Sequence, residues 1–270
     1  MNAWNPMTFE GKDTILRVVR DEAERMFAMA EKPGAWEEPT ACEDWQVRDI
    51  IGHIVDTTEG YFKAFETARA GGSADTHGLP VMHELAGAGG KAFRDHTQAE
   101  MMGRIRTDLD KMMGILEPLT EDEWGGLMVP HAYMGPVPAF VYAGGQLMDY
   151  GVHSWDIREG IGRAHALSAD AADLLAPFMF IIWQSTVRAS ADLSPFTIGV
   201  TVSGRNAGAF RVSVSDQGMA YEPGDVSDLP TVIDFDAGSL VLTAFGRING
   251  GNIRGDQHLG ERFLNLFYRI

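Results

Sequence analysis

The sequence predicts a helical bundle over residues 1–190, followed by a small α+β domain over residues 191–270. Two observations carry this prediction. Through most of the first 190 residues, apolar side chains recur at three- and four-residue spacing, as on helices that bury one face. After Leu193-Ser194-Pro195 the spacing changes to strict alternation, which is typical of half-buried strands. With 270 residues, 45% of them apolar, the chain is long enough for two such domains.

Helical spacing covers five segments of the predicted bundle. Pro33-Gly34 ends the first helix, Asp44 is expected to cap the second, and Gly71-Gly72 ends it. Residues 71–98 are rich in Gly, Ala and His, and we expect a long loop there with a short helical piece. Residues 118–136 hold four Pro or Gly breaks and predict a turn region. The five expected helices lie at 12–31, 44–69, 98–117, 137–160 and 168–189.

Alternating residues predict strands at 196–202, 210–214 and 219–222. The connections between them are too short for a crossover, so we expect antiparallel pairing. A further strand is expected at 231–236. Asp236 and Asp256 are placed to cap helices over 237–245 and 256–268.

Composition excludes several classes of protein. The net charge of -16 disfavours nucleic-acid binding, because an acidic surface repels phosphate. No apolar run reaches the ~18 residues of a membrane-spanning helix, and the opening MNAWNPMTFEGKD lacks the pattern of a secretory leader. Cys42 is the only cysteine, so neither an intramolecular disulfide nor a Cys-rich zinc cluster is possible. We therefore expect a cytoplasmic protein that binds neither nucleic acid nor membrane.

A polar row on the fourth predicted helix indicates a metal site. Asp149 and His153 are four residues apart, so both project from one helix face, in a row with Tyr142 and Gln146. His53 lies beside the apolar stripe of the second helix. Taken alone, the first pair is explained by a solvated helix face and His53 by a partly buried histidine. Together they supply two imidazoles and a carboxylate, the three protein ligands of a catalytic zinc site with one open position. Zinc is the first choice, and iron, nickel or cobalt would also suit these ligands.

Two motifs resemble a known family. Pro39-Thr40-Ala41-Cys42-Glu43-Asp44-Trp45-Gln46-Val47-Arg48-Asp49-Ile50-Ile51-Gly52-His53 is similar to the P-T-x-C-x-x-W-x-V-x-D-x-x-x-H signature of the mycothiol-dependent maleylpyruvate isomerase family, whose bundle is DinB-like. Asp149-Tyr150-Gly151-Val152-His153-Ser154-Trp155-Asp156-Ile157 resembles its second signature, and residues 196–270 resemble its sterol-carrier-like C-terminal domain.

The resemblance implies a site as well as a fold. It assigns metal ligation to His53, Asp149 and His153, although the isomerase itself has Glu where this chain has Asp149. It also implies a catalytic arginine in the C-terminal domain that binds a substrate or cofactor carboxylate. Arg247 best matches that position, and Arg254 is the second choice.

Other residues near the motifs have both an ordinary and a functional interpretation. His131 is proposed as a general acid that enters the site, and Tyr142 and Gln146 as contacts of the bound thiol. Asp156 is expected to be a helix charge or salt-bridge partner, with a hydrogen bond to a ligand histidine as the alternative. The remaining side chains are expected to be buried or solvated rather than functional: Cys42, Trp45 and Trp155 in the interior, and His77, His83 and His96 in the long loop. For both Trp residues the alternative is an aromatic wall of the pocket.

The residues and the resemblance together predict a metal-dependent enzyme that activates mycothiol. The thiolate would isomerise a small electrophilic substrate or transfer sulfur to it, and the sequence does not separate isomerase from S-transferase. Two alternatives stay open: a metal-dependent hydrolase on the same bundle, and a non-catalytic lipid- or ligand-binding protein that uses the C-terminal domain. The expected partners are a small-molecule substrate and a small thiol, and the expected state is a monomer or weak homodimer.

Overall fold

The computed structural model describes residues 2–163, 166–188, 190–268 and 270. Contacts between Cα atoms divide the chain into two compact units, Met1–Leu167 and Ser168–Ile270. The predicted fold class is confirmed, with a helical first part and a sheet with helices in the second.

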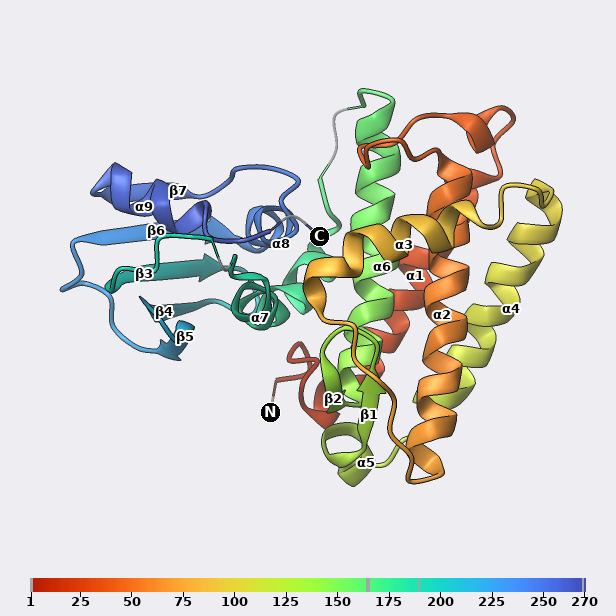
Figure 1. Cartoon of the computed structure of the whole chain (residues 1–270), viewed down its shortest axis with the longest axis horizontal. Coiled ribbons are helices and arrows are strands. Elements are labelled where there is room, and N and C mark those ends of the chain that lie inside the picture. Colours follow the sequence, from red (N-terminus) through yellow and green to blue (C-terminus); the bar gives the residue numbers. More distant parts are fainter. Residues whose placement is uncertain (1, 164–165, 189, 269) are drawn as a thin grey trace. The chain divides into compact units, whose positions relative to one another are not determined.

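Four long helices form the first unit: α1 (Lys12–Ala30), α2 (Val47–Arg69), α4 (Gln98–Leu116) and α6 (Phe140–Gly160). They lie side by side, with α2 next to both α4 and α6 and α1 packed along α6 (Figure 1). All four were predicted from apolar spacing, and the predicted bounds differ from the observed ones by up to three residues. Short 3-10 turns at Phe9–Gly11, Ala35–Glu37 and Leu79–Val81 connect parts of this unit.

The start of α2 differs from the prediction. Asp44 does not cap this helix, because its backbone has a positive φ of 62° and lies in the loop before it. The N-cap is Gln46, whose backbone N–H donates to the Asp49 carboxylate at 2.9 Å. Arg94 in turn donates to both oxygens of buried Asp49 at 2.7 Å. The helix start is therefore held by an ion pair from a distant segment, which local spacing does not reveal.

The short helical piece expected within 71–98 is present, and the expected turn region 118–136 contains regular structure. The segment 71–98 includes α3 (Met82–Lys91), and 118–136 includes α5 (Glu121–Gly126) and most of a hairpin of β1 (Met128–His131) and β2 (Gly135–Pro138). The sequence of α3 is glycine-rich and has low intrinsic helix propensity. Its glycines allow close packing on α2: a Cβ at Gly90 would lie 2.7 Å from the carbonyl oxygen of Asp49. Tertiary packing therefore stabilises a helix that local preference disfavours.

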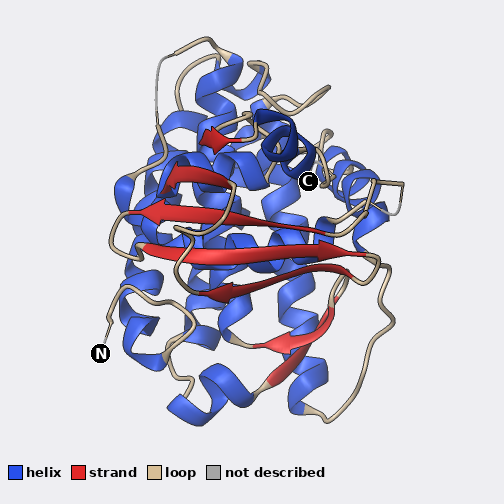
Figure 2. Ribbon diagram, turned by 90° about the vertical axis from the view of Figure 1, so that its left-hand side faces the viewer, coloured by secondary structure: helices blue, strands red, loops and turns tan. Residues whose placement is uncertain are grey.

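The second unit is a five-stranded sheet covered by three helices. Its strands are β3 (Phe196–Ser203), β4 (Gly208–Ser215), β5 (Gly218–Pro223), β6 (Thr231–Asp236) and β7 (Asn252–Gly255), in the order β5-β4-β3-β6-β7 (Figure 2). The helices are α7 (Ala169–Thr186), α8 (Ala237–Ala244) and α9 (Gln257–Leu264). Asp236 and Asp256 cap α8 and α9 as predicted.

The sheet is mixed rather than wholly antiparallel. β3, β4 and β5 pair antiparallel, as the short turns between them require. β6 pairs parallel with β3, because the chain crosses over from β5 before it enters the sheet again. The sequence also missed β7, a short strand at the edge that pairs with β6.

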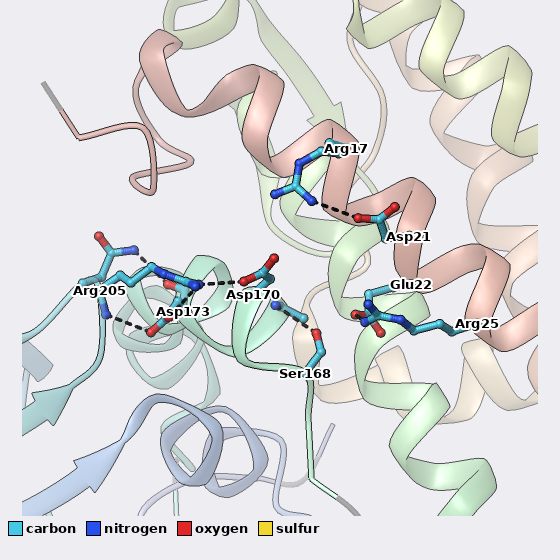
Figure 3. Close-up of polar contacts among 10 residues, drawn as sticks. Arg17, Asp21, Glu22, Arg25, Ser168, Asp170, Asp173 and Arg205 are labelled. Atoms are coloured by element: carbon cyan, nitrogen blue, oxygen red, sulfur yellow. Dashed lines mark hydrogen bonds and ion pairs between the residues drawn. The ribbon is translucent and has the colours of Figure 1, made fainter.

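The expected boundary at residue 190 falls after α7, whereas the compact units divide before it. The contacts of α7 explain the difference. Trp183 packs against Phe235 of β6 and Phe263 of α9, with ring centroids 6.0 and 5.2 Å apart. At the start of α7, Arg205 from the β3–β4 turn pairs with Asp170 and Asp173 (Figure 3). The helix thus belongs to the core of the sheet unit.

None of the helices in the described ranges combines the length and the apolar character that a bilayer crossing requires.

Candidate functional site

Three side chains from two bundle helices converge at one point. His53 projects from α2, and Asp149 and His153 project from α6 one turn apart. One potential ligand atom from each lies within 4.8 Å of the other two. The His53 Nε2 is 3.6 Å from an Asp149 carboxylate oxygen. The structure therefore brings together the three residues that the sequence selected, although metal ligation itself stays a prediction.

The three side chains fit a divalent cation. They are 12–14% exposed, so each keeps a small area in contact with solvent. The second carboxylate oxygen of Asp149 is buried, and no hydrogen bond reaches it within the part of the chain that the structure describes. An unsatisfied buried carboxylate oxygen is costly, and a metal ion would satisfy it. The Thr57 hydroxyl lies 3.5 Å from His53 Nδ1, and the other ring nitrogen, Nε2, faces Asp149.

Asp156 orients His153, the second histidine of the triad. Its fully buried carboxylate lies 2.8 Å from His153 Nδ1, so Nε2 is the nitrogen that would coordinate a metal. Carboxylate–histidine pairs of this kind orient metal ligands in many proteins. The Cys42 thiol donates to the same carboxylate oxygen at 3.2 Å. Cys42, His153 and Asp156 also form a second group whose ligand atoms lie within 4.8 Å of one another. Of the two interpretations of Asp156, this geometry favours the hydrogen bond to the histidine.

One of the two tryptophans forms a wall of the site. The Trp45 ring is stacked on His153, with centroids 6.0 Å apart, and tilted against His53 at 5.3 Å. It is only partly buried, so it closes one side of the triad rather than filling a core. Trp155 is 7% exposed and belongs to the interior. The loop that carries Trp45 is anchored on α6, where the backbone N–H of Ala41 donates to the carbonyl of Asp156.

The polar row of α6 continues away from the triad along buried side chains. The Tyr142 hydroxyl donates to the Pro130 carbonyl at 2.8 Å, which ties the β1–β2 hairpin to α6. The Gln146 amide donates to the Thr58 hydroxyl of α2 at 3.0 Å. Tyr142 and Gln146 are each at most 1% exposed. Contact of either residue with a thiol stays a prediction, and the bonds they form position α2 and the hairpin.

His131 lies in the hairpin, next to this row. Its Nδ1 accepts two backbone hydrogen bonds, from Tyr133 and Met134, both at 3.2 Å. Burial lowers the pKa of His131 to about 4, against the opposing effect of the Asp149 charge. At neutral pH the imidazole is therefore neutral, with its proton on Nε2. It is suited to donate a hydrogen bond rather than to act as an imidazolium acid.

The remaining predicted residues lie in the second unit or in the segment 71–98. Arg247 follows α8, and its guanidinium donates to the carbonyls of Phe245 and Ile270. Its action on a substrate stays a prediction. Arg254 pairs with Asp234 on the neighbouring strand, and its charge is compensated there. Of the loop histidines, His96 is exposed and the backbone of His77 pairs with Ala132 of the hairpin. His83 falls in α3, and its side chain lies outside the described part of the structure.

Sequence reasoning missed one polar side chain near the site. Tyr61 lies on α2, where it is partly exposed and its ring centroid is 4.7 Å from that of Tyr142. Its hydroxyl lies over α6: a Cβ at Gly145 would be 2.6 Å from that oxygen. The spacing of eight residues from His53 places Tyr61 on the same helix face two turns away, and this signal could have identified it.

Comparisons with known proteins agree with this architecture. The sequence profile of the mycothiol maleylpyruvate isomerase N-terminal domain matches residues 17–158, about half of the chain. A crystal structure of the mycothiol-dependent maleylpyruvate isomerase is similar with a TM-score of 0.60 at 16% identity, over 92% of this chain and 93% of that one. A histidine-to-alanine variant of that enzyme matches with the same TM-score and coverage at 15% identity. Identities this low show the fold alone. A comparison with curated proteins gave no match.

Proposed function

The chain belongs to the mycothiol maleylpyruvate isomerase N-terminal domain family, and from this premise we propose that it is a metal-dependent enzyme acting with a low-molecular-weight thiol. The proposed thiol is mycothiol, and the proposed reaction is isomerisation of, or S-transfer to, a small electrophile. The observation that carries the proposal is the convergence of His53, Asp149 and His153, with ligand atoms within 4.8 Å.

A divalent cation at this site, with zinc as the first choice, would stabilise the thiolate form of the thiol near neutral pH. The residues of the chain prepare the site for that charge. His53 and His153 present Nε2 atoms because Thr57 and Asp156 lie at their other ring nitrogens. Asp149 presents a carboxylate oxygen that has no other partner among the described residues. Trp45 shields one side of the two imidazoles from water.

Isomerisation and S-transfer share the activated thiolate and differ in the fate of the sulfur. Addition of sulfur to a cis double bond leaves a single bond that rotates, and elimination then returns the thiol and the trans product. In S-transfer the sulfur displaces a leaving group and stays attached. Arg247 is our candidate for pairing with a carboxylate of the substrate or thiol, because a guanidinium matches carboxylate geometry. Its charge would hold the carboxylate through either reaction.

The first test is metal content. Purified without chelators, the protein should hold about one divalent metal per chain, as a three-ligand site requires. His153→Ala should lose the metal and stay folded, because the residue is on the rim of the core. His96→Ala, which removes an exposed histidine, is the matched control and should keep the metal. Mass spectrometry of the metal and circular dichroism measure both properties, and unchanged metal in H153A would contradict the ligand assignment.

The second test is the reaction itself. The metal-loaded protein is incubated with maleylpyruvate or another electrophile, with and without mycothiol, and products are identified by mass spectrometry. We expect turnover that requires the thiol and disappears in H153A. Hydrolysis at the same rate without thiol would instead show a hydrolase on the same scaffold, and the proposed function would be rejected.

A further inference from the structure

Three rings gather about two helical turns from the triad, where α2, α6 and the hairpin meet. Tyr142 is buried at the centre, with the rings of Tyr61 and His131 at 4.7 and 5.9 Å from it. Tyr61 and His131 are themselves 6.4 Å apart and both are partly exposed. The charge of Asp149 acts on both groups: it adds to the effect of burial, which raises the pKa of Tyr61, and it opposes the effect of burial, which lowers the pKa of His131 to about 4. The ring cluster is thus adjacent to the proposed metal ligands without belonging to them.

The two outer rings present hydrogen-bond donors. The Nδ1 of His131 accepts from two backbone N–H groups, so the ring proton is on Nε2. The Tyr61 hydroxyl stays protonated, because burial and the Asp149 charge raise the pKa of Tyr61. Within the described ranges, neither the Tyr61 hydroxyl nor the His131 Nε2 has a hydrogen-bond partner, whereas the Tyr142 hydroxyl is bound to Pro130. Donors left without a partner beside a reaction site are suited to bind an oxygen of a ligand.

The positions of both donors are fixed by their surroundings. Gly145 provides the space for the Tyr61 hydroxyl over α6, since a side chain there would displace it. The hairpin turn holds the His131 ring through hydrogen bonds from the backbone of Tyr133 and Met134, and both outer rings pack against Tyr142. Preorganised neutral donors stabilise negative charge on oxygen without giving up a proton. Two neutral imidazoles and one carboxylate would also leave a divalent cation with a net positive charge, which favours an anionic ligand nearby.

We propose that the Tyr61 hydroxyl and the His131 Nε2–H form a binding subsite for a carboxylate or keto oxygen of the substrate. This inference rests on the proposed function, and it identifies two side chains that would hold an oxygen of its substrate. It gives Tyr61 and His131 a role in substrate binding, separate from the metal ligands and from binding of the thiol.

The test uses Tyr61→Phe and His131→Asn in the full-length, metal-loaded protein. Phenylalanine keeps the ring contact with Tyr142 and removes only the hydroxyl. Asparagine offers an oxygen near the position of Nδ1, so the hairpin bonds are retained while the Nε2 donor is lost. Tyr221→Phe removes a hydroxyl from the second unit and is the control. The probe is maleate, with binding measured by calorimetry and metal content measured in each variant.

We expect Y61F and H131N each to weaken maleate binding roughly 10- to 100-fold, as for loss of a hydrogen bond to a charged group. Metal content and the KM for thiol should not change, and Y221F should match the wild type. Maleate affinity within twofold of wild type in both variants would overturn the subsite, as would a wild type that does not bind maleate. If H131N does not fold, the maleate affinity of Y61F alone decides whether the subsite exists.

The two proposals fail separately. Thiol-dependent turnover with unchanged maleate affinity in Y61F and H131N would reject the subsite and keep the function. Donor-dependent maleate binding in a protein that shows no thiol-dependent turnover would reject the function and keep the subsite.

Discussion

At the scale of single residues, the orientation of a proposed metal ligand depends on a buried neighbour, Asp156. Asp156 is fully buried and accepts a hydrogen bond from the Cys42 thiol on the oxygen that faces His153. One carboxylate oxygen thus fixes the orientation of the His153 ring and determines that Nε2 is its proposed coordinating atom. The sequence showed only that Asp156 lies three residues after His153, which on a helix is equally typical of a surface pair.

The contact between Asp156 and His153 predicts a loss of metal affinity in Asp156→Asn. The amide keeps the volume and removes the charge that polarises the imidazole, so zinc affinity should fall roughly 10- to 100-fold. Competition with a chromophoric chelator measures the affinity. Asp108→Asn, which also removes a buried carboxylate from the bundle, is the control and should bind zinc as the wild type does. Equal affinity in D156N and D108N would show that Asp156 has no positioning role.

A second buried carboxyl predicts a pH dependence of stability. Burial raises the pKa of Asp108 to about 6, and the charge of Glu59 adds to the effect. One of its oxygens has no hydrogen-bond partner among the described residues. Because the folded pKa lies above the unfolded value, folding favours the protonated form. This contribution is fully present below about pH 4 and is lost as the pH rises through about 6.

Asp108→Asn should therefore stabilise the protein more at alkaline than at acid pH. A shift of about two pKa units corresponds to about 3 kcal/mol, which is the upper bound for the added stability of D108N at about pH 8 relative to about pH 4. Urea denaturation of both proteins at the two pH values measures it. A pH-independent difference between them would show that Asp108 is ionised in the folded protein across this range.

At the scale of elements, the glycine-rich helix α3 is stabilised by its packing on α2. Its glycines allow the two backbones to approach closely, and Gly90 also lies against His53: a Cβ there would be 3.2 Å from the Cβ of His53 and 2.7 Å from the Asp49 carbonyl. The position of a proposed ligand on α2 is therefore coupled to the packing of α3.

Gly90→Ala should destabilise the protein and weaken metal binding together. The added methyl group must push α3 away from α2, which we expect to cost about 1–3 kcal/mol, as overpacking usually does. Gly103→Ala is the matched control, because Gly103 is on α4 with no atom within 4 Å of the added Cβ. It should stabilise by about 0.5–1 kcal/mol through the higher helix propensity of alanine. Thermal denaturation and chelator competition measure the two effects; a G90A protein as stable as G103A would contradict the packing argument.

At the scale of the whole molecule, the placement of α7 decides which residues form the second unit. The predicted boundary at 190 is based on the change from helical spacing to strict alternation of apolar residues. That change marks where strands begin, and it does not mark where one hydrophobic core ends and the next begins. The aromatic contacts of Trp183 and the ion pairs of Arg205 connect α7 to the sheet (Figure 3).

The division after Leu167 predicts how fragments behave. A fragment of residues 168–270 should unfold cooperatively in urea, because it keeps the helix that covers β5 and packs against α8. A fragment of residues 191–270 lacks that helix, exposes the apolar side of the sheet, and should aggregate or show no cooperative transition. Equal cooperativity of the two fragments would show that α7 is not part of this core.

The sequence by itself determined the long bundle helices, the alternating strands, the caps of α8 and α9, and the choice of His53, Asp149 and His153. These features depend on local spacing or on motifs, and both are patterns of residues that are close together in the sequence. Only the tertiary structure decided where the helical piece of 71–98 lies, that β6 lies parallel to β3, that Trp45 covers the triad, and that Asp156 contacts His153. Those features depend on contacts between segments far apart in the chain. Their energies come from packing and from hydrogen bonds that no local pattern records.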